Sequence, residues 1–238
     1  MKDNLDLVRN WYNANYTDRG FDAQRLYPNE EFCRFMGRNF FSIPKKERKN
    51  VQILEIGCGS CANLWMVANE GFSTYGLDIS KESINLGYKM MKKRHCKADL
   101  KIGSMTNIPW ADNSFDAVAD ILAAYCLEEE NFKFCINEVV RVLKPGGKFF
   151  SYTPGKKSMA YIDYHPAILI DSSTLNGIHR KNSPFSGNHF PHRFVSPDEY
   201  EKQMINAGMK VRYLETVTRT YRNMNEDFEF VVSEAIKI

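Results

Sequence analysis

The sequence predicts an α/β fold in which a mostly parallel sheet carries helices on both faces. Short apolar runs typical of buried parallel strands alternate with amphipathic segments along the chain. A glycine turn, Gly57-Cys58-Gly59, directly follows the first of these runs. An acid, Asp78, ends the next run, 21 positions after Gly57. These three observations fix the class before any other element is considered.

The segment 51–78 predicts a strand, a turn, a helix and a second strand. Residues 51–56 form the first apolar run, 62–69 the helix and 72–77 the second strand. Glycine tolerates positive φ and lets the backbone approach a ligand closely, and the first N–H groups of the helix point back over the turn. An acid at the tip of the second strand can hold the two ribose hydroxyls of an adenosine. The segment therefore predicts a site for an adenosine-containing ligand.

The glycine turn fits two kinds of ligand. Gly57, Gly59 and Ala62 satisfy the G-x-G-x-x-G/A pattern of dinucleotide-binding folds, in which a pyrophosphate lies at the helix N-terminus. Read from Glu55, the same segment resembles the first motif of class I S-adenosylmethionine-dependent methyltransferases, acid-x-Gly-x-Gly-x-Gly. Cys61 stands in place of the third glycine, where a small side chain is tolerated but narrows the room above the methionine part of the cofactor.

Two later motifs favour the methyltransferase. Residues 108–116, IPWADNSFD, resemble the family's approach to strand four, and residues 142–147, VLKPGG, resemble its turn before strand five. With the glycine turn they occur in the family's order and spacing. The resemblance is close over 51–153 and looser elsewhere. It implies a Rossmann-like seven-stranded sheet with helices on both faces, an antiparallel C-terminal strand, an N-terminal helical lid and an insertion after strand five.

The resemblance also implies which residues hold S-adenosylmethionine, whose product is S-adenosylhomocysteine. Relatives commonly place an acid after strand three against the adenine, but here that position carries Ser104 or Met105. Asp120 has two interpretations, because it can contact the methionine ammonium or the acceptor, or only cap the segment 121–127. The predicted cofactor residues are Tyr16, Arg25, Glu55, Gly57, Cys58, Gly59, Cys61, Asn63, Asp78, Ile79, Ser80, Ser104, Met105, Asp120, Ile121 and Leu122.

The first fifty residues predict two helices. Residues 6–15 have an amphipathic pattern, and Asn29 is a plausible N-cap for a helix that ends at Arg38. In small-molecule members of the family such helices fold over the cofactor. Tyr16, Arg25 and Tyr27 are therefore candidates for a lid, although aromatic side chains here can equally pack the helices on the sheet.

The remaining elements follow from periodicity and caps. Ser80 is expected to cap the helix after Asp78, and Ser196 with Pro197 marks the start of another helix that ends near Gly208. The other predicted helices and strands are 81–93, 99–102, 115–120, 128–142, 147–153, 210–218 and 228–236.

Residues 154–194 break the pattern and form a loop-rich insertion. Long loops in compact domains are usually functional, and relatives often bind the acceptor with this segment. It holds four of the five histidines. Histidine suits a general base near neutral pH, which a hydroxyl acceptor benefits from and a neutral amine does not need. The candidate catalytic residues are His165, His189 and His192, although a surface or structural role is an alternative for each.

Bulk properties exclude several classes. The net charge of +3 is too mild for a nucleic-acid partner, and no apolar run approaches the length of a membrane span. The N-terminus lacks the apolar core of a secretory signal, so a reducing cytoplasm is expected. The pair Cys58 and Cys61 is explained by the small residues that a cofactor loop requires. No metal site is predicted, since Asp163 near His165 is only a weak indication.

The sequence thus predicts one methyltransferase domain over 1–238. Its parts are the lid at 1–50, the cofactor core at 51–153, the acceptor-side insertion at 154–194 and the C-terminal helix and strands at 195–238. No Asn-Pro-Pro-Tyr type motif follows strand four, which disfavours base-amino methylation. The expected acceptor is a small polar metabolite, with a sugar or nucleotide-sugar hydroxyl or amine first. A non-catalytic partner subunit of the same fold, or an NAD-dependent oxidoreductase, is the alternative. A homodimer is one expectation for the assembly.

Overall fold

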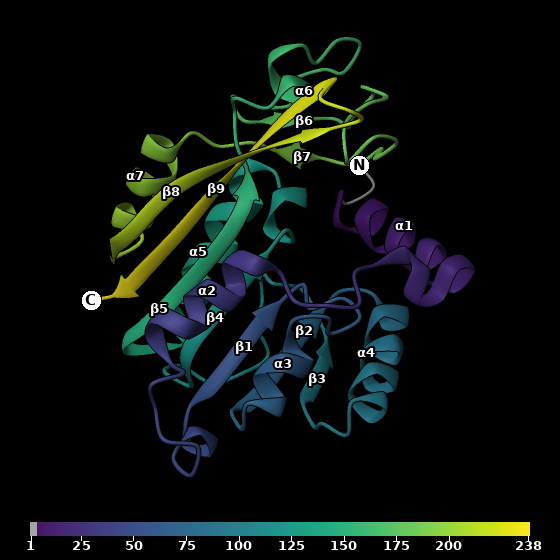
Figure 1. Cartoon of the computed structure of the whole chain (residues 1–238). Helices are drawn as coiled ribbons and strands as arrows, with labels where there is room; N and C mark the ends of the chain where they lie inside the picture. The colour runs from purple at the N-terminus through teal and green to yellow at the C-terminus, as the bar shows by residue number, and fades with distance from the viewer. Residues whose placement is uncertain (1–3) are drawn as a thin grey trace.

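The computed structural model describes residues 4–238 and contains a seven-stranded sheet of order β3-β2-β1-β4-β5-β9-β8 (Figure 1). The strands from β3 to β5 pair in parallel, whereas β9 is antiparallel to both β5 and β8. This confirms the predicted fold class. The strands are β1 (Gln52–Ile56), β2 (Ser73–Asp78), β3 (Asp99–Ile102), β4 (Phe115–Ile121), β5 (Leu143–Pro154), β8 (Met209–Tyr221) and β9 (Glu226–Lys237).

The helices begin where the capping residues predict. Asn29 Oδ1 accepts the Phe32 N–H at 3.2 Å, and Ser80 Oγ accepts the Ser83 N–H at 3.1 Å. Ser196 starts its helix with a capping box. The helices are α1 (Asn4–Arg19), α2 (Glu30–Asn39), α3 (Leu64–Asn69), α4 (Lys81–Lys93), α5 (Glu129–Val142), α6 (Met159–Ile162) and α7 (Pro197–Asn206), with short 3-10 turns η1 (Gly20–Ala23), η2 (Arg48–Asn50) and η3 (Ala124–Cys126). No helix within residues 4–238 is long and apolar enough to cross a membrane.

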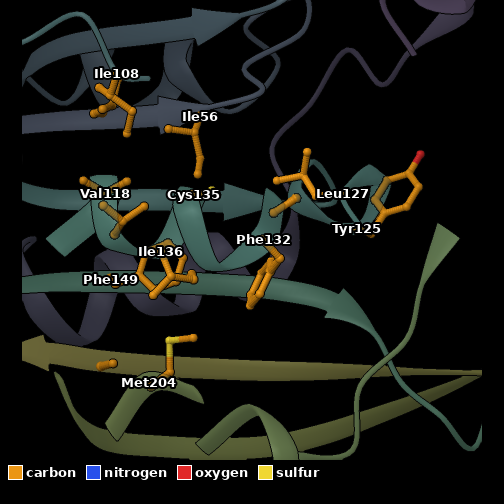
Figure 2. Close-up of a cluster of buried hydrophobic side chains, with 14 of the residues drawn as sticks. Ile56, Ile108, Val118, Tyr125, Leu127, Phe132, Cys135, Ile136, Phe149 and Met204 are labelled. Carbon is orange, nitrogen blue, oxygen red and sulfur yellow. The ribbon is translucent and has the colours of Figure 1, made fainter. Parts of the chain in front are cut away.

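Successive residues of each strand point to opposite faces of the sheet, and their side chains form two separate hydrophobic cores, one on each face. On one face, side chains of α5 and α7 pack on strand residues such as Val118 and Phe149 (Figure 2). On the other face, Phe32 and Phe35 of α2 pack on Phe150 and its neighbours. Burying one such aromatic side chain stabilises the fold by about 1.5–3 kcal/mol relative to leaving it exposed. The sheet is therefore covered on both sides.

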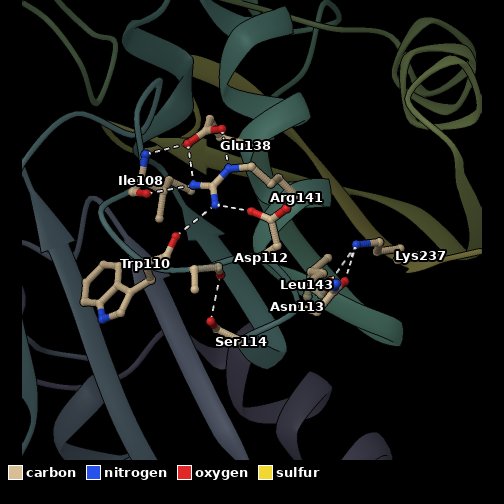
Figure 3. Close-up of polar contacts among 10 residues, drawn as sticks. Ile108, Trp110, Asp112, Asn113, Ser114, Glu138, Arg141, Leu143 and Lys237 are labelled. Atoms are coloured by element: carbon tan, nitrogen blue, oxygen red, sulfur yellow. Dashed lines mark hydrogen bonds and ion pairs between the residues drawn. The ribbon is translucent and has the colours of Figure 1, made fainter.

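A single arginine on α5 holds the loop between β3 and β4 (Figure 3). Arg141 donates to the carbonyls of Ile108 and Trp110 at 2.8 and 2.9 Å and to Asp112 Oδ1 at 2.8 Å. Glu138, one helical turn away, accepts from the same guanidinium at 2.7 Å. These bonds satisfy backbone groups of residues 108–112, in the loop that leads into β4.

Several elements differ from the expectation: α1 continues to Arg19, and β5 begins at Leu143 rather than 147. The C-terminal hairpin is longer, because β8 continues to Tyr221 and β9 begins at Glu226. Many residues of β8, the edge strand, are polar and exposed, so the sequence shows no clear alternation of apolar and polar residues there. The insertion contains α6 and a two-stranded sheet of β6 (Thr174–Leu175) and β7 (His192–Arg193), which gathers around the far end of β8 and β9 (Figure 1).

Candidate active site

A cavity of about 770 Å³, here called the main cavity, opens at the carboxyl ends of β1 and β4. It extends across the sheet to residues of β5, β9 and β8, and α1, η1 and residues 184–188 also line it. Pockets for small molecules usually span about 300–1,000 Å³, and open α/β sheets bind ligands at this edge. The main cavity is thus the candidate active site.

The glycine turn approaches the segment after β4 more closely than a side chain would allow. Gly57 has a φ of 65°, and a Cβ added to it would lie 2.2 Å from the Ala123 Cβ. Cys61 also has a positive φ, 64°, in the place where relatives carry a third glycine. Its side chain is buried under the turn and lines no described cavity, whereas Cys58 lines the main cavity. Helix α3 starts at Leu64 rather than 62, because the turn occupies the intervening residues.

Asp78 fixes the turn at the tip of β2. Its Oδ2 accepts the Gly59 N–H and its Oδ1 accepts the Ser80 N–H, both at 2.8 Å. Burial raises the pKa of this carboxyl, while the two backbone donors oppose that shift. Asp78 also lines the two smaller cavities beneath α1, where its remaining lone pairs can accept from ribose hydroxyls.

Glu55 presents a buried oxygen to the main cavity. Asn63 Nδ2 donates to its Oε1 at 2.5 Å, but its Oε2 has no hydrogen-bond partner within residues 4–238. Burial raises the pKa of Glu55 to about 8. A buried carboxylate needs a cation or a donor. The ammonium of a bound S-adenosylmethionine would supply both, so the residues present fit this cofactor.

Asp120, at the end of β4, makes the contacts of a cap. Its Oδ1 accepts the N–H groups of Ala123 and Ala124 at 3.0 Å, and its Oδ2 accepts from Ser151 Oγ at 3.2 Å. Burial raises the pKa of Asp120 to about 6. It lines none of the described cavities, so its visible contacts are those of the capping alternative rather than of a ligand.

Helix α1 covers the cofactor end of the site. Ser80 Oγ donates to Asn13 Oδ1 at 2.7 Å, and Gln24 Nε2 donates to the buried hydroxyl of Tyr16. The hydroxyls of Tyr12 and Tyr125 lie 2.9 Å apart. These bonds join α1 to the start of α4 and to the segment after β4.

Two smaller cavities lie under α1, with volumes of about 20 and 50 Å³. Ile79 and Met105 line both, and Ser104 lines the smaller one; Val8 of α1 closes them. Both are far smaller than a nucleoside. The side chains that line them must therefore rearrange for an adenosine to fit beside Asp78.

The far end of the main cavity is aromatic and basic. Tyr152 of β5 stacks on Phe230 of β9 with ring centroids 4.6 Å apart. Arg219 and Tyr221 of β8 lie beside them, and Phe185 of the insertion lines the same cavity. The sequence patterns did not single out these residues, because they stand on three different strands and one loop.

None of the three candidate histidines lines a described cavity. His165 and His189 are exposed. His192 is wholly buried against Tyr125 and Phe185, its two ring nitrogens have no partner within residues 4–238, and burial lowers its pKa to about 3. The predicted base therefore has no support in the geometry of the site.

Metal ligands are likewise not gathered at the site. Across the described residues, 4–238, no group of three or more His, Cys, Asp or Glu side chains is placed to hold a metal ion. Asp163 pairs instead with Arg180 at 2.6 Å, and Arg180 also pairs with Glu226 at 2.6 Å.

The structure brings most of the predicted cofactor residues together. Those that line a described cavity are Tyr16, Arg25, Glu55, Gly57, Cys58, Asn63, Asp78, Ile79, Ser104, Met105, Ile121 and Leu122. Gly59, Cys61, Ser80 and Asp120 support the surrounding backbone instead, and Tyr27 packs on Trp65 outside the cavities. Tyr12 and Tyr125 are functional candidates that sequence patterns missed.

The comparisons with known proteins agree with the fold. Residues 53–147 match the family model described as a methyltransferase domain. The chain is 36% identical over 102 residues to the phthiotriol/phenolphthiotriol dimycocerosates methyltransferase of Mycobacterium tuberculosis, a match that covers 41% of this chain and only 36% of that protein's length. It is 24% identical over 194 residues to the ubiquinone biosynthesis O-methyltransferase of Agrobacterium fabrum, covering 80% of this chain and 72% of that one.

A solved structure extends the likeness over almost the whole chain. The 1,6-didemethyltoxoflavin-N1-methyltransferase of Burkholderia thailandensis, with bound 1,6-didemethyltoxoflavin and S-adenosylhomocysteine, has a TM-score of 0.63 at 11% identity and covers 98% of this chain and 88% of that one. Identity this low supports the fold alone. The family match falls on the same strands and loops that build the cofactor end of the cavity, so residues 53–147 form a methyltransferase domain with the fold of class I S-adenosylmethionine-dependent methyltransferases.

Proposed function

We propose that this protein transfers the methyl group of S-adenosylmethionine to a small polar metabolite bound in the main cavity. One observation carries the proposal: a single cavity runs from Glu55 and Gly57, at the cofactor end, to Tyr152 and Arg219, at the far end. A donor and an acceptor can therefore meet in one cavity.

The cofactor supplies an electrophilic methyl group on a sulfonium. In our proposal Asp78 accepts from its ribose hydroxyls, Glu55 faces its ammonium and Arg25 faces its carboxylate. Ile121 and Leu122 line the cavity between these groups and the far end. Positioning of the two reactants alone can supply several kcal/mol of the rate enhancement.

The side chains around the acceptor are suited to a polar, partly planar molecule. Tyr125 can donate to an acceptor atom when its hydroxyl accepts from that of Tyr12, because either oxygen of this pair can be the donor. A sugar or nucleotide-sugar hydroxyl or amine is the acceptor that the sequence favours. Of these, a nucleotide sugar matches the aromatic and basic far end better than a neutral sugar does, because it carries both a planar base and negative charge.

Calorimetric titration with S-adenosylmethionine, S-adenosylhomocysteine and NAD tests the cofactor. We expect binding of the first two and none of NAD; tight NAD binding without a response to S-adenosylhomocysteine would overturn the proposal. Methyl transfer is then assayed with labelled cofactor against nucleotide sugars and other small metabolites. Tight cofactor binding with no acceptor methylated would instead favour the non-catalytic partner subunit.

A further inference from the structure

The far end of the main cavity carries a cation with a fixed place on the sheet. Phe230 of β9 pairs with Val217 of β8, and directly opposed residues of an antiparallel pair share a face. Arg219 and Tyr221 follow Val217 at two and four residues, so they lie on the same face as Phe230. Arg219 therefore lies on the face of the sheet that borders the main cavity, and it lines this cavity.

Within residues 4–238 Arg219 has no carboxylate at hydrogen-bond distance, unlike Arg180 and Arg38. Its nearest acid is Glu30, at 3.7 Å, and Glu30 already accepts from Arg34 at 2.8 Å. By contrast, Arg180 lies 2.6 Å from Glu226. No side-chain hydrogen bond of Arg219 occurs within residues 4–238, and the side chain is 46% exposed. Its guanidinium thus remains available to an anion.

The other arginines of the cavity are already accounted for. Arg19 donates to the carbonyl of Asp22 at 2.8 Å. Arg25 is assigned to the methionine carboxylate in the proposed function, and its charge acts on Glu55 at the cofactor end. Arg219 is the cation left for the acceptor.

An aromatic platform lies next to this cation. The rings of Tyr152 and Phe230 stack with centroids 4.6 Å apart and planes inclined by 18°. Burial raises the pKa of Tyr152, and the charge of Arg219 is the next largest influence and opposes that shift, which is consistent with a guanidinium near the phenol. Tyr152 and Phe230 both line the main cavity although only 3% of each is exposed, so a planar ligand can pack against their exposed atoms while its charged end reaches Arg219.

We propose that the acceptor is an aromatic or otherwise planar molecule with an anionic group, a carboxylate or a phosphate, which Arg219 binds beside the Tyr152–Phe230 platform. This inference rests on the proposed function and narrows its acceptor. The guanidinium fork matches both carboxylate and phosphate with two parallel hydrogen bonds, so the structure favours an anion without distinguishing between them. Arg212 on the same strand, which is exposed and lines no described cavity, represents an ordinary edge-strand charge.

Ligand-observed NMR titrations of the S-adenosylhomocysteine complex test this. The probes are benzoate, phenyl phosphate and the neutral isostere benzamide, and the variants are Arg219→Gln and Arg212→Gln. We expect at least one anion to bind the natural chain about tenfold or more tightly than benzamide, the effect of one charge-assisted hydrogen bond. Arg219→Gln should abolish this preference and Arg212→Gln should keep it. Which anion binds better separates a carboxylate from a phosphate acceptor.

Three results would overturn the inference: equal binding of benzamide and both anions, an anion preference that survives Arg219→Gln, or no binding of any probe at millimolar concentration. Cofactor affinity is measured first in the same samples. If S-adenosylhomocysteine does not bind, the proposed function itself fails; if it binds and no anion preference is found, only the anionic acceptor is excluded.

Discussion

The phenolic oxygens of Tyr12 and Tyr125 lie 2.9 Å apart and join the covering helix α1 to the segment that follows β4. Burial raises the pKa of both phenols, so the pair stays neutral and the contact is a hydrogen bond rather than an ion pair. The bond connects the part of the chain that covers the cofactor with the part that meets the acceptor.

Removing either hydroxyl should loosen α1. A net hydrogen bond contributes about 0.5–1.5 kcal/mol, so we expect Tyr12→Phe and Tyr125→Phe each to weaken S-adenosylhomocysteine binding by about two- to tenfold. The double variant should lose little more than either single one, because both remove the same bond. Calorimetry measures this, with Tyr88→Phe on α4 as the control, since Tyr88 donates to Leu100 away from the cavities. Fully additive losses would contradict a shared bond.

Asp78 is expected to act on both the cofactor and its loop. Asp78→Ala should weaken S-adenosylhomocysteine binding by about 1–3 kcal/mol, since it removes a charged acceptor for the ribose hydroxyls. It also removes the bonds to Gly59 and Ser80, so a lower melting temperature should accompany the loss. Asp99→Asn is the control and should change neither quantity. Asp99 is exposed at the start of β3, whereas Asp78 pairs with Ile102 at the end of that strand. An unchanged dissociation constant for Asp78→Ala would exclude the ribose contact.

Glu55 should make the stability of the protein without ligand depend on pH. Its pKa rises from 4.5 to about 8 because the carboxyl is buried, so the folded state holds a proton that the unfolded state releases between these values. The contribution of Glu55 to stability is therefore full below about pH 4.5, falls as the pH rises to about 8 and is then constant. Glu55→Gln should remove this contribution. Thermal unfolding of both proteins from pH 5 to 9 checks it; a difference between them that does not change with pH would contradict the raised pKa.

Cofactor binding should release the same proton. An ammonium beside Glu55 favours the carboxylate and lowers its pKa, so S-adenosylhomocysteine should displace close to one proton near pH 7. Calorimetry in buffers of different ionisation enthalpy counts the protons. Glu55→Gln should release fewer protons, while proton uptake by the natural chain would indicate that the ammonium lies elsewhere.

His192 should act on stability and not as the base. Its pKa falls from 6.5 to about 3 on burial, so the unfolded state gains a proton first and stability is lost as the pH falls through this range. His192→Phe should reduce this acid sensitivity and retain methyl transfer. His165→Ala and His189→Ala, which change exposed side chains, should also retain it. A drop of ~10²-fold in turnover for any of the three would restore that histidine as a catalytic candidate.

The sequence predicts the fold and the cofactor end better than the acceptor end, for a physical reason. Gly57 and Asp78 belong to one continuous strand-turn-helix-strand unit, where local geometry alone decides what meets the ligand. Tyr152, Arg219 and Phe230 meet only after β9 inserts between β5 and β8, and that register is not visible in any single segment.

The histidines of the insertion are a second case in which the sequence did not predict which side chains meet. Clustering in the chain suggested a shared site for His165, His189 and His192. The insertion folds so that two of them face solvent and the third fills an aromatic core around Tyr125 and Phe194. Sequence proximity within a long loop carries little information about which side chains converge.

The closure of α1 over Asp78 has a kinetic consequence. Val8 and Tyr16 are almost completely buried, and the side chain of Asn13 is bonded to Ser80, so we expect a bound nucleoside to leave when these contacts open. The strands of the sheet need not move. The residence time of S-adenosylhomocysteine should then be set by detachment of one helix, and a first turnover faster than all later ones would be the sign that this detachment, rather than transfer of the methyl group, limits the rate.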